Sequence, residues 1–231
     1  MEKADNIRVE TTQAKFYSSA TKEVPMSHVT ITEEFGWPFK LNVQRTKLTE
    51  EQFIVLCQEN PELRLELSAQ GELIIMPPTG SAGGWRSGKV FLALGIWTNK
   101  DQTGLSFDSS TGFTLPNGAI RSPDASWILR ERWTALAKAQ REKFAPICPD
   151  FVAEVRSQSD KLSDLLDKMQ EYLDNGARLG WLIDPLDKRA YIYRPGQPVE
   201  TLENPEVLSG DSVLPGFVFQ IQELWEPSAA E

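Results

Sequence analysis

The chain has 231 residues, of which 40% are hydrophobic and 25% charged, and its formal net charge is −9. This composition is typical of a globular protein with one substantial core, and the longest apolar runs are too short to cross a membrane. The negative charge argues against a protein that coats nucleic acid through a basic surface, and the polar N-terminus, without the apolar stretch of a secretory signal, favours a cytoplasmic protein.

The N-terminal part of the chain differs in pattern from the rest. Residues 1–40 contain few periodic apolar positions and predict a tail or loosely attached arm. The rest, over residues 41–226, predicts a single domain. Its first strong element is a short helix that begins after Thr49, because Thr49 and Gln52 have the spacing of a capping box.

Hydrophobic periodicity predicts the remaining elements. Alternating apolar positions indicate strands, a period near 3.6 indicates helices, and Gly, Pro and Asn-Gly pairs separate them. In chain order we expect a β-hairpin over 63–76, a helix over 81–99, strands over 104–110, 112–116 and 122–129, a helix over 131–144, a strand over 149–157, a helix over 161–174, strands over 179–185 and 190–196, and a closing segment over 216–225. This order predicts the α/β class, with a mixed β-sheet flanked by α-helices.

Histidine and cysteine usage excludes several kinds of enzyme. His28 is the only histidine, and Cys57 and Cys148, the only cysteines, lack C-x-x-C spacing. A Ser-His-Asp or Cys-His hydrolase would depend on His28 alone, and neither a zinc cluster nor a disulfide framework is indicated. In an enzyme of this composition, carboxylates, lysines or hydroxyls must carry the proton and metal chemistry.

One carboxylate interrupts an apolar strand. The segment FVAEV, residues 151–155, reads as a buried strand except for Glu154. Arg156 lies on the same face, roughly 6.6 Å further along. Glu154 could therefore form a salt bridge with Arg156, or it could bind a cation, since a buried carboxylate is costly unless it is paired or bound to a metal.

A second carboxylate favours the cation. Asp124 follows Pro123 at the start of a predicted strand, and neighbouring strands could bring it close to Glu154. The dipeptide Pro149-Asp150 has the same letters, but Asp150 is four residues from Glu154 on one strand, roughly 13 Å away. Asp150 therefore cannot share an ion with Glu154, whereas Asp124 can.

The arrangement of these residues resembles a nuclease signature. Pro123-Asp124 followed by Glu154-Val155-Arg156 is similar to the PD-(D/E)xK pattern of the restriction endonuclease-like superfamily. The longer segments GELIIMPPTG, SPDASW, PDFVAEVRSQSD, KMQEYLDNGARLGWLIDP and YIYRPG resemble the Uma family (Uma two) of restriction endonucleases, over roughly residues 40 to 225.

The resemblance implies roles for individual residues. Asp124 and Glu154, with the backbone carbonyl of Val155, would hold Mg²⁺ or Mn²⁺, and Glu72 is a further candidate because family members carry an acidic residue there. Arg156 occupies the usual lysine position, where it cannot accept a proton but can stabilise charge on a phosphate. Lys168 is the replacement lysine that the family implies, which would position or deprotonate the attacking water.

The resemblance also implies a DNA substrate and, for cleavage of both strands, a homodimer. The stretch from residue 121 to residue 168 holds nine basic and eight acidic residues, so it is less repulsive to phosphate than the rest of the chain. A mixed solvated surface would explain the same count.

Three alternatives are open. Lys168 could instead pair with Asp164 one helical turn away, and Asp184 could cap a turn rather than orient the site. Because Arg156 replaces a lysine, the chain could be a catalytically inactive nuclease-fold module that binds nucleic acid or protein.

The segment 83–90 fits a P-loop except that Val90 stands where the metal-binding hydroxyl is needed, which disfavours nucleotide hydrolysis.

Overall fold

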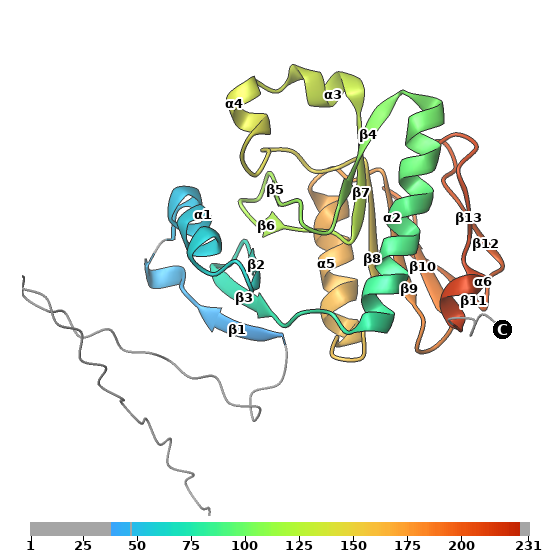
Figure 1. Cartoon of the computed structure of the whole chain (residues 1–231), viewed down its shortest axis with the longest axis horizontal. Helices are drawn as coiled ribbons and strands as arrows, with labels where there is room; N and C mark the ends of the chain where they lie inside the picture. Colours follow the sequence, from blue (N-terminus) through green and yellow to red (C-terminus); the bar gives the residue numbers. More distant parts are fainter. Residues whose placement is uncertain (1–37, 47, 227–231) are drawn as a thin grey trace, which may run out of the picture. The chain divides into compact units, whose positions relative to one another are not determined.

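The computed structural model describes residues 38–46 and 48–226 (Figure 1). The predicted tail over 1–40 therefore lies, up to residue 37, outside the described residues, as does His28. The expected boundary at residue 40 falls within the first strand, β1 (Phe39–Asn42), which pairs antiparallel with β3 (Glu72–Met76).

A six-stranded mixed sheet forms the centre of the described part of the chain, in the order β11-β10-β9-β8-β7-β4. β8 and β9 are parallel, and every other neighbouring pair in this sheet is antiparallel. The strands are β4 (Gly104–Asp108), β7 (Ala125–Leu129), β8 (Phe151–Val155), β9 (Leu179–Asp184), β10 (Arg189–Tyr193) and β11 (Glu200–Glu203).

A second, antiparallel sheet contains the predicted hairpin, in the order β1-β3-β2-β6-β5. The hairpin turns at Gly71, whose φ of 77° is a backbone conformation that glycine adopts without steric cost. The smaller strands are β2 (Arg64–Leu67), β5 (Phe113–Thr114) and β6 (Ile120–Arg121), and β12 (Val207–Ser209) pairs with β13 (Val218–Gln220) in a separate two-stranded sheet.

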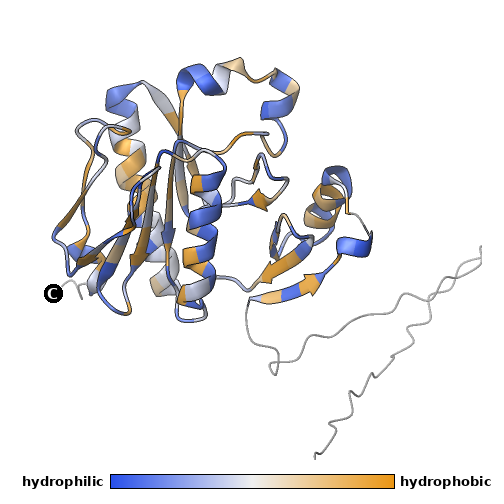
Figure 2. Ribbon diagram, turned by 180° about the vertical axis from the view of Figure 1, so that it is seen from behind, coloured by the Kyte–Doolittle hydropathy of each residue, from blue (hydrophilic) through white to orange (hydrophobic). Residues whose placement is uncertain are grey.

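Two long helices cover opposite faces of the central sheet. α2 (Ser81–Asp101) packs on β4, β7 and β8, and α5 (Leu162–Asp174) packs on β9 and β10. The buried residues form one hydrophobic cluster on each side, with Trp181 on the α2 side and Tyr172 on the α5 side. Figure 2 shows α5, the helix in the middle of that view, as alternating polar and apolar bands, which is the pattern of a helix with one buried face.

The shorter helices agree in part with the sequence. α1 (Glu50–Glu59) begins at the predicted capping box, with both of its hydrogen bonds formed between Thr49 and Gln52. The predicted helix over 131–144 is wrong as a single element, because it is divided into α3 (Arg130–Ala135) and α4 (Lys138–Arg141). The break lets Trp133 and Leu136 both pack against the apolar cluster on the α5 side.

The remaining short elements are η1 (Gln44–Thr46) and α6 (Gln222–Trp225). The P-loop pattern over 83–90 lies inside α2, so it has no loop that could surround a phosphate. Among the described residues, no helix is both long enough and apolar enough to cross a membrane. The predicted α/β class, a mixed sheet flanked by helices, is confirmed.

Candidate active site

The two predicted acidic residues lie opposite each other on paired strands. β7 and β8 are antiparallel with Ala125 opposite Ala153, and one further step of this register brings Asp124 opposite Glu154. Directly opposed residues in an antiparallel pair point to the same side of the sheet. The Val155 N–H also donates a 2.9 Å hydrogen bond to Asp124 Oδ2, which fixes this carboxylate at the end of β8.

α5 brings two more polar groups to Glu154. The Nζ of Lys168 lies 2.8 Å from Glu154 Oε1, and the Tyr172 hydroxyl donates a 3.0 Å hydrogen bond to the same oxygen. Both residues are on the sheet-facing side of α5, one turn apart. The alternative pairing of Lys168 with Asp164 is not formed, because Asp164 pairs with Lys40 at 2.9 Å.

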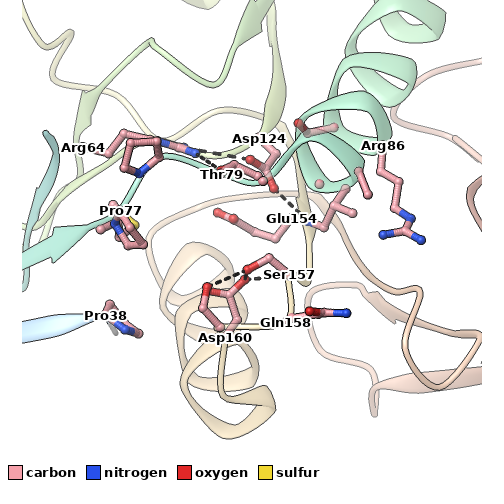
Figure 3. Close-up of a pocket in the computed structure, with 18 of the residues that line it drawn as sticks. Pro38, Arg64, Pro77, Thr79, Arg86, Asp124, Glu154, Ser157, Gln158 and Asp160 are labelled. Atoms are coloured by element: carbon pink, nitrogen blue, oxygen red, sulfur yellow. Dashed lines mark hydrogen bonds and ion pairs between the residues drawn. The ribbon is translucent and has the colours of Figure 1, made fainter. Parts of the chain in front are cut away.

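Asp124, Glu154 and Lys168 open onto one pocket of about 500 Å³ (Figure 3). Its other walls come from Arg64 of β2, the first turn of α2 and the loop that follows β8. Arg64 Nη2 is 3.9 Å from Asp124 Oδ1. The three predicted residues are therefore brought together from β8, from the residue that precedes β7, and from α5.

Both pocket carboxylates lie where their charge is disfavoured. Burial raises the pKa of Glu154 to about 7, and the neighbouring carboxylates of Asp124 and Glu66 add to the rise, while Lys168 opposes it. Burial also raises the pKa of Asp124, although the Val155 N–H and Arg64 oppose the rise. Burial is the main cause of both rises, and the neighbouring cations offset it only in part.

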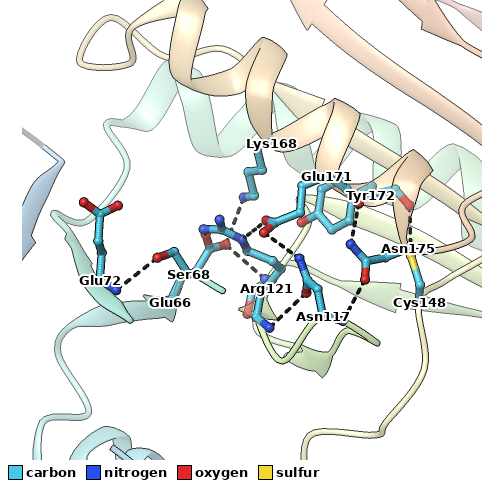
Figure 4. Close-up of polar contacts among 12 residues, drawn as sticks. Glu66, Ser68, Glu72, Asn117, Arg121, Cys148, Lys168, Glu171, Tyr172 and Asn175 are labelled. Carbon is cyan, nitrogen blue, oxygen red and sulfur yellow. Dashed lines mark hydrogen bonds and ion pairs between the residues drawn. The ribbon is translucent and has the colours of Figure 1, made fainter. Parts of the chain in front are cut away.

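A second buried carboxylate, that of Glu66, also contacts Lys168 (Figure 4). Glu66 Oε1 lies 2.9 Å from Lys168 Nζ, and Arg121 Nη1 lies 3.1 Å from Glu66 Oε2. Burial raises the pKa of Glu66, but Lys168 and Arg121 outweigh it and lower the pKa to about 2. Burial alone would lower the pKa of Lys168, but Glu154 and Glu66 outweigh this effect and raise it.

Arg156 is not brought together with the pocket residues. Its Nη1 lies 2.7 Å from Asp184 Oδ2, and Asp184 is fully buried. Asp184 Oδ1 accepts a hydrogen bond from the Leu186 N–H, as the turn interpretation expects. Stabilisation of phosphate charge by Arg156 stays a prediction.

The remaining acidic residues, Glu72 and Asp150, lie outside the pocket, and Val155 contacts it in another way than the family implies. Glu72 begins β3 and lines a neighbouring cavity of about 620 Å³. Val155 lines the pocket, but the contact that it makes with Asp124 is through its N–H, so a metal bond from its carbonyl stays a prediction. Asp150 is fully buried elsewhere, where it accepts a hydrogen bond from the Leu129 N–H.

Sequence reasoning missed Glu66, Arg121 and Arg64 as site residues. Glu66 stands in the alternating hairpin RLEL, where the pattern places a polar residue on a solvent-facing side. In the structure Lys168 of α5 and Arg121 of β6 contact Glu66, which is 2% exposed. The sequence carries no local signal for this, because the covering residue, Lys168, lies about a hundred positions away.

The donor set fits a hard divalent cation. Mg²⁺ prefers carboxylate oxygens, and it commonly binds through one or two of them and fills its remaining positions with water and substrate phosphate. In the part of the chain that the structure describes, no group of three or more His, Cys, Asp and Glu side chains could hold a metal ion. Asp124 and Glu154 would fit an ion that takes two protein carboxylates and keeps water in its other positions, and burial raises the pKa of both groups.

Comparisons with known proteins bear on the family and the fold. Residues 50–222 match the family model described as "Uma2: Putative restriction endonuclease". A crystal structure described as "a putative nuclease belonging to DUF820 from Anabaena variabilis ATCC 29413" shares the fold, with a TM-score of 0.64 and 20% sequence identity over 77% of this chain and 97% of that chain. No curated protein matches the sequence. The family resemblance seen in the sequence is confirmed.

Proposed function

The chain belongs to the Uma2 family of restriction endonuclease-like proteins, and we propose that it is a metal-dependent DNA endonuclease of the PD-(D/E)xK type. The observation that carries the proposal is the convergence of Asp124 and Glu154, from neighbouring strands, on one pocket that also contains Lys168. Two carboxylates and a lysine are the groups with which this superfamily hydrolyses phosphodiester bonds.

Asp124 and Glu154 would hold one Mg²⁺ or Mn²⁺ ion. When bound, the ion would supply Lewis-acid polarisation of the scissile phosphate and lower the pKa of the attacking water. The carboxylates are suited to this part because their hydrogen bonds to Val155 and Tyr172 leave each group with oxygen lone pairs that face the pocket. Because the pKa of Glu154 is raised to about 7, a cation would bind there with release of a proton near neutral pH.

Lys168 would position the attacking water and stabilise the developing phosphate charge. Its raised pKa keeps the amine protonated, so it donates hydrogen bonds and does not accept a proton. Of the two roles that the family implies for this lysine, the geometry favours positioning over deprotonation. Electrostatic groups fixed in advance around a reacting phosphate are a large source of rate enhancement.

The pocket side of α2 would receive the DNA backbone. Gly80 precedes the helix and no side chain caps its start, so the first N–H groups of α2 have no side-chain acceptor, and the first turn lines the pocket. Such N–H groups attract phosphate oxygens. Arg64 and Arg86, which line the same pocket, would add positive charge on either side of this helix end.

Plasmid cleavage with Mg²⁺, with Mn²⁺ and with EDTA tests the proposal. We expect the wild type to cut only with the divalent ions, and the variants Asp124→Asn, Glu154→Gln and Lys168→Met to lose roughly 100-fold or more in rate, as expected when a group that stabilises the transition state is removed. Isothermal calorimetry should show Mn²⁺ binding to the wild type and none to Asp124→Asn.

Asp150→Asn is the matched control, because Asp150 also follows a proline and is also buried, but it lies outside the pocket. This variant should keep the wild-type rate and Mn²⁺ affinity. Equal cleavage in EDTA, or equal rates in the wild type and the three pocket variants, would contradict the proposal. Absence of cleavage in every protein would support a non-catalytic nuclease-fold module instead.

A further inference from the structure

We propose that Glu66 is a positioning residue for the hydrolytic reaction, which anchors Lys168 at the edge of the catalytic pocket. The inference rests on the proposed function and assigns a role to a residue of β2, in a sheet separate from the strands that carry Asp124 and Glu154.

Lys168 Nζ lies between two carboxylates. It is 2.8 Å from Glu154 Oε1 and 2.9 Å from Glu66 Oε1. Its side chain is 12% exposed, and that of Glu66 is 3% exposed, so this pair is shielded from water and from salt. A flexible lysine stem of four carbons is held in one place by two charge-assisted hydrogen bonds.

Glu66 is itself fixed by other contacts. The Ser122 N–H donates a 3.0 Å hydrogen bond to Oε1, and Arg121 Nη1 contacts Oε2 at 3.1 Å. Arg121 in turn lies 2.6 Å from Glu171 of α5. Each oxygen of Glu66 therefore has a cationic partner. The orientation of the Glu66 carboxylate is set by Arg121 of β6, by Ser122, which follows β6, and by Lys168 of α5.

A cation in the pocket would change the balance around Lys168. Glu154 would share its charge with the cation, so its attraction for the ammonium would weaken, and the cation would repel the ammonium. Glu66 lines the neighbouring cavity and not the metal pocket, so a cation in the pocket would leave its contact with Lys168 in place. It is the carboxylate that can hold the ammonium in place during the reaction.

A purely structural role is the competing explanation. Glu66 also joins the hairpin sheet to α5, and a buried carboxylate with several partners can serve the fold alone. The two roles differ in what depends on Lys168. A positioning residue acts on the rate through Lys168, whereas a structural residue changes stability whether or not Lys168 is present.

A double-mutant cycle in kcat separates these roles. Glu66→Gln, Lys168→Met and the double variant are compared with the wild type on plasmid DNA with Mn²⁺. We expect Glu66→Gln to lower kcat by about 10-fold to 100-fold, the effect of a small misplacement of a catalytic group, with KM for DNA within about twofold of the wild-type value. The double variant should be no slower than Lys168→Met, and Glu66→Asp should recover part of the rate.

Asp150→Asn is again the matched control. Asp150 is a buried carboxylate that pairs with Arg132 and accepts a hydrogen bond from a backbone N–H. Glu66 has the same two kinds of contact, with Arg121 and with the Ser122 N–H. Its change in kcat should be small. A double variant that is slower than Lys168→Met by the full Glu66→Gln factor would overturn the inference and leave the proposed function intact. Absence of cleavage by the wild type would overturn both.

A readout without DNA or metal completes the test. The buried, ion-paired ammonium of Lys168 should give a resolved ¹H–¹⁵N signal in the metal-free wild type, because its protons exchange slowly with water, and Lys168→Arg identifies the signal. Glu66→Gln should lose it while the protein remains folded by circular dichroism. Asp150→Asn should keep it. A Lys168 signal that is unchanged in Glu66→Gln would overturn the inference, because the lysine would then be held by Glu154 alone.

Discussion

Glu154 carries its charge at a position that disfavours it. The side chain is buried on β8, two other carboxylates lie near it, and Lys168 only partly offsets them. Natural proteins retain such groups at functional sites, where the missing positive charge comes from a ligand. The metal-free protein should therefore be less stable than its packing alone would allow.

This imbalance predicts how stability depends on pH. The pKa of Glu154 rises from its ordinary value of 4.5 to about 7 in the folded protein, so between these values the unfolded chain loses the proton while the folded chain keeps it. The stabilisation from this group is complete below pH 4.5 and is lost as pH rises through 7. In EDTA, urea unfolding should show a fall in stability over this interval that Glu154→Gln lacks. Parallel stability curves for the two proteins would contradict the shift, and Mn²⁺ should restore the wild type near neutral pH.

Site residues differ in how well the sequence predicts them. Asp124 and Glu154 were identifiable because each breaks a local pattern, a Pro-Asp pair at a strand entry and a carboxylate in an apolar strand. Glu66 breaks no pattern, since alternation in RLEL is normal for a hairpin. Its burial arises from long-range packing against α5, which composition and periodicity do not encode. For Arg156, the sequence placed the residue on the strand with Glu154 as a possible partner, whereas it follows β8 and pairs with Asp184.

The spacing between α5 and β9 depends on how the whole helix packs on the strand, and not on one contact. Gly180 of β9 lies beneath α5, where a Cβ atom would come within 2.5 Å of Met169 Cε. Met169 is fully buried one position after Lys168. A larger residue at position 180 would have to displace the Met169 side chain, which is next in sequence to Lys168, the residue that contacts Glu154.

Gly180→Val should therefore weaken both the fold and the site. Overpacking a core of this kind costs about 1–3 kcal/mol, and displacement of α5 should lower the cleavage rate as well. Gly88→Ala in α2 is the matched control, because a Cβ there meets nothing within 4 Å, and removal of a helical glycine should stabilise the protein by roughly 0.5–1 kcal/mol. Thermal unfolding and plasmid cleavage measure the two effects. If Gly180→Val unfolded and cleaved like the wild type, the close approach would have no role in positioning α5.

At the level of elements, long periodic segments were predicted well and short ones were not. α2 and α5 were identified from apolar spacing over many residues. β11 and β12 were not expected, because ETLE and VLS are too short to show a period, and only pairing with a neighbouring strand makes them strands. The break between α3 and α4 was also not visible in the local sequence, because apolar packing there outweighs a continuous helical pattern.

The whole molecule carries a net charge of −9, which bears on how it can bind DNA. A protein of this charge repels a polyanion over most of its surface, so favourable contacts are confined to a few cations. Arg64 and Arg86 line the proposed pocket, and the neighbouring cavity includes Glu66, Glu72 and several aspartates. The DNA backbone should therefore approach from the side of α2 and contact few phosphates.

The salt dependence of DNA affinity measures that number of contacts. Each phosphate contact changes the slope of log K against log salt by about −0.9, so Arg64, Arg86 and Lys168 together predict a slope of roughly −2 to −3. Binding is measured with Ca²⁺ in place of Mg²⁺, to separate binding from cleavage. Arg64→Ala should make the slope shallower by about 1, and Arg194→Ala should leave it unchanged, because Arg194 is paired with Glu200 and Asp211 outside the pocket. A slope near −6 or steeper would require a basic surface beyond these residues, and would show that the pocket is not where most of the DNA is bound.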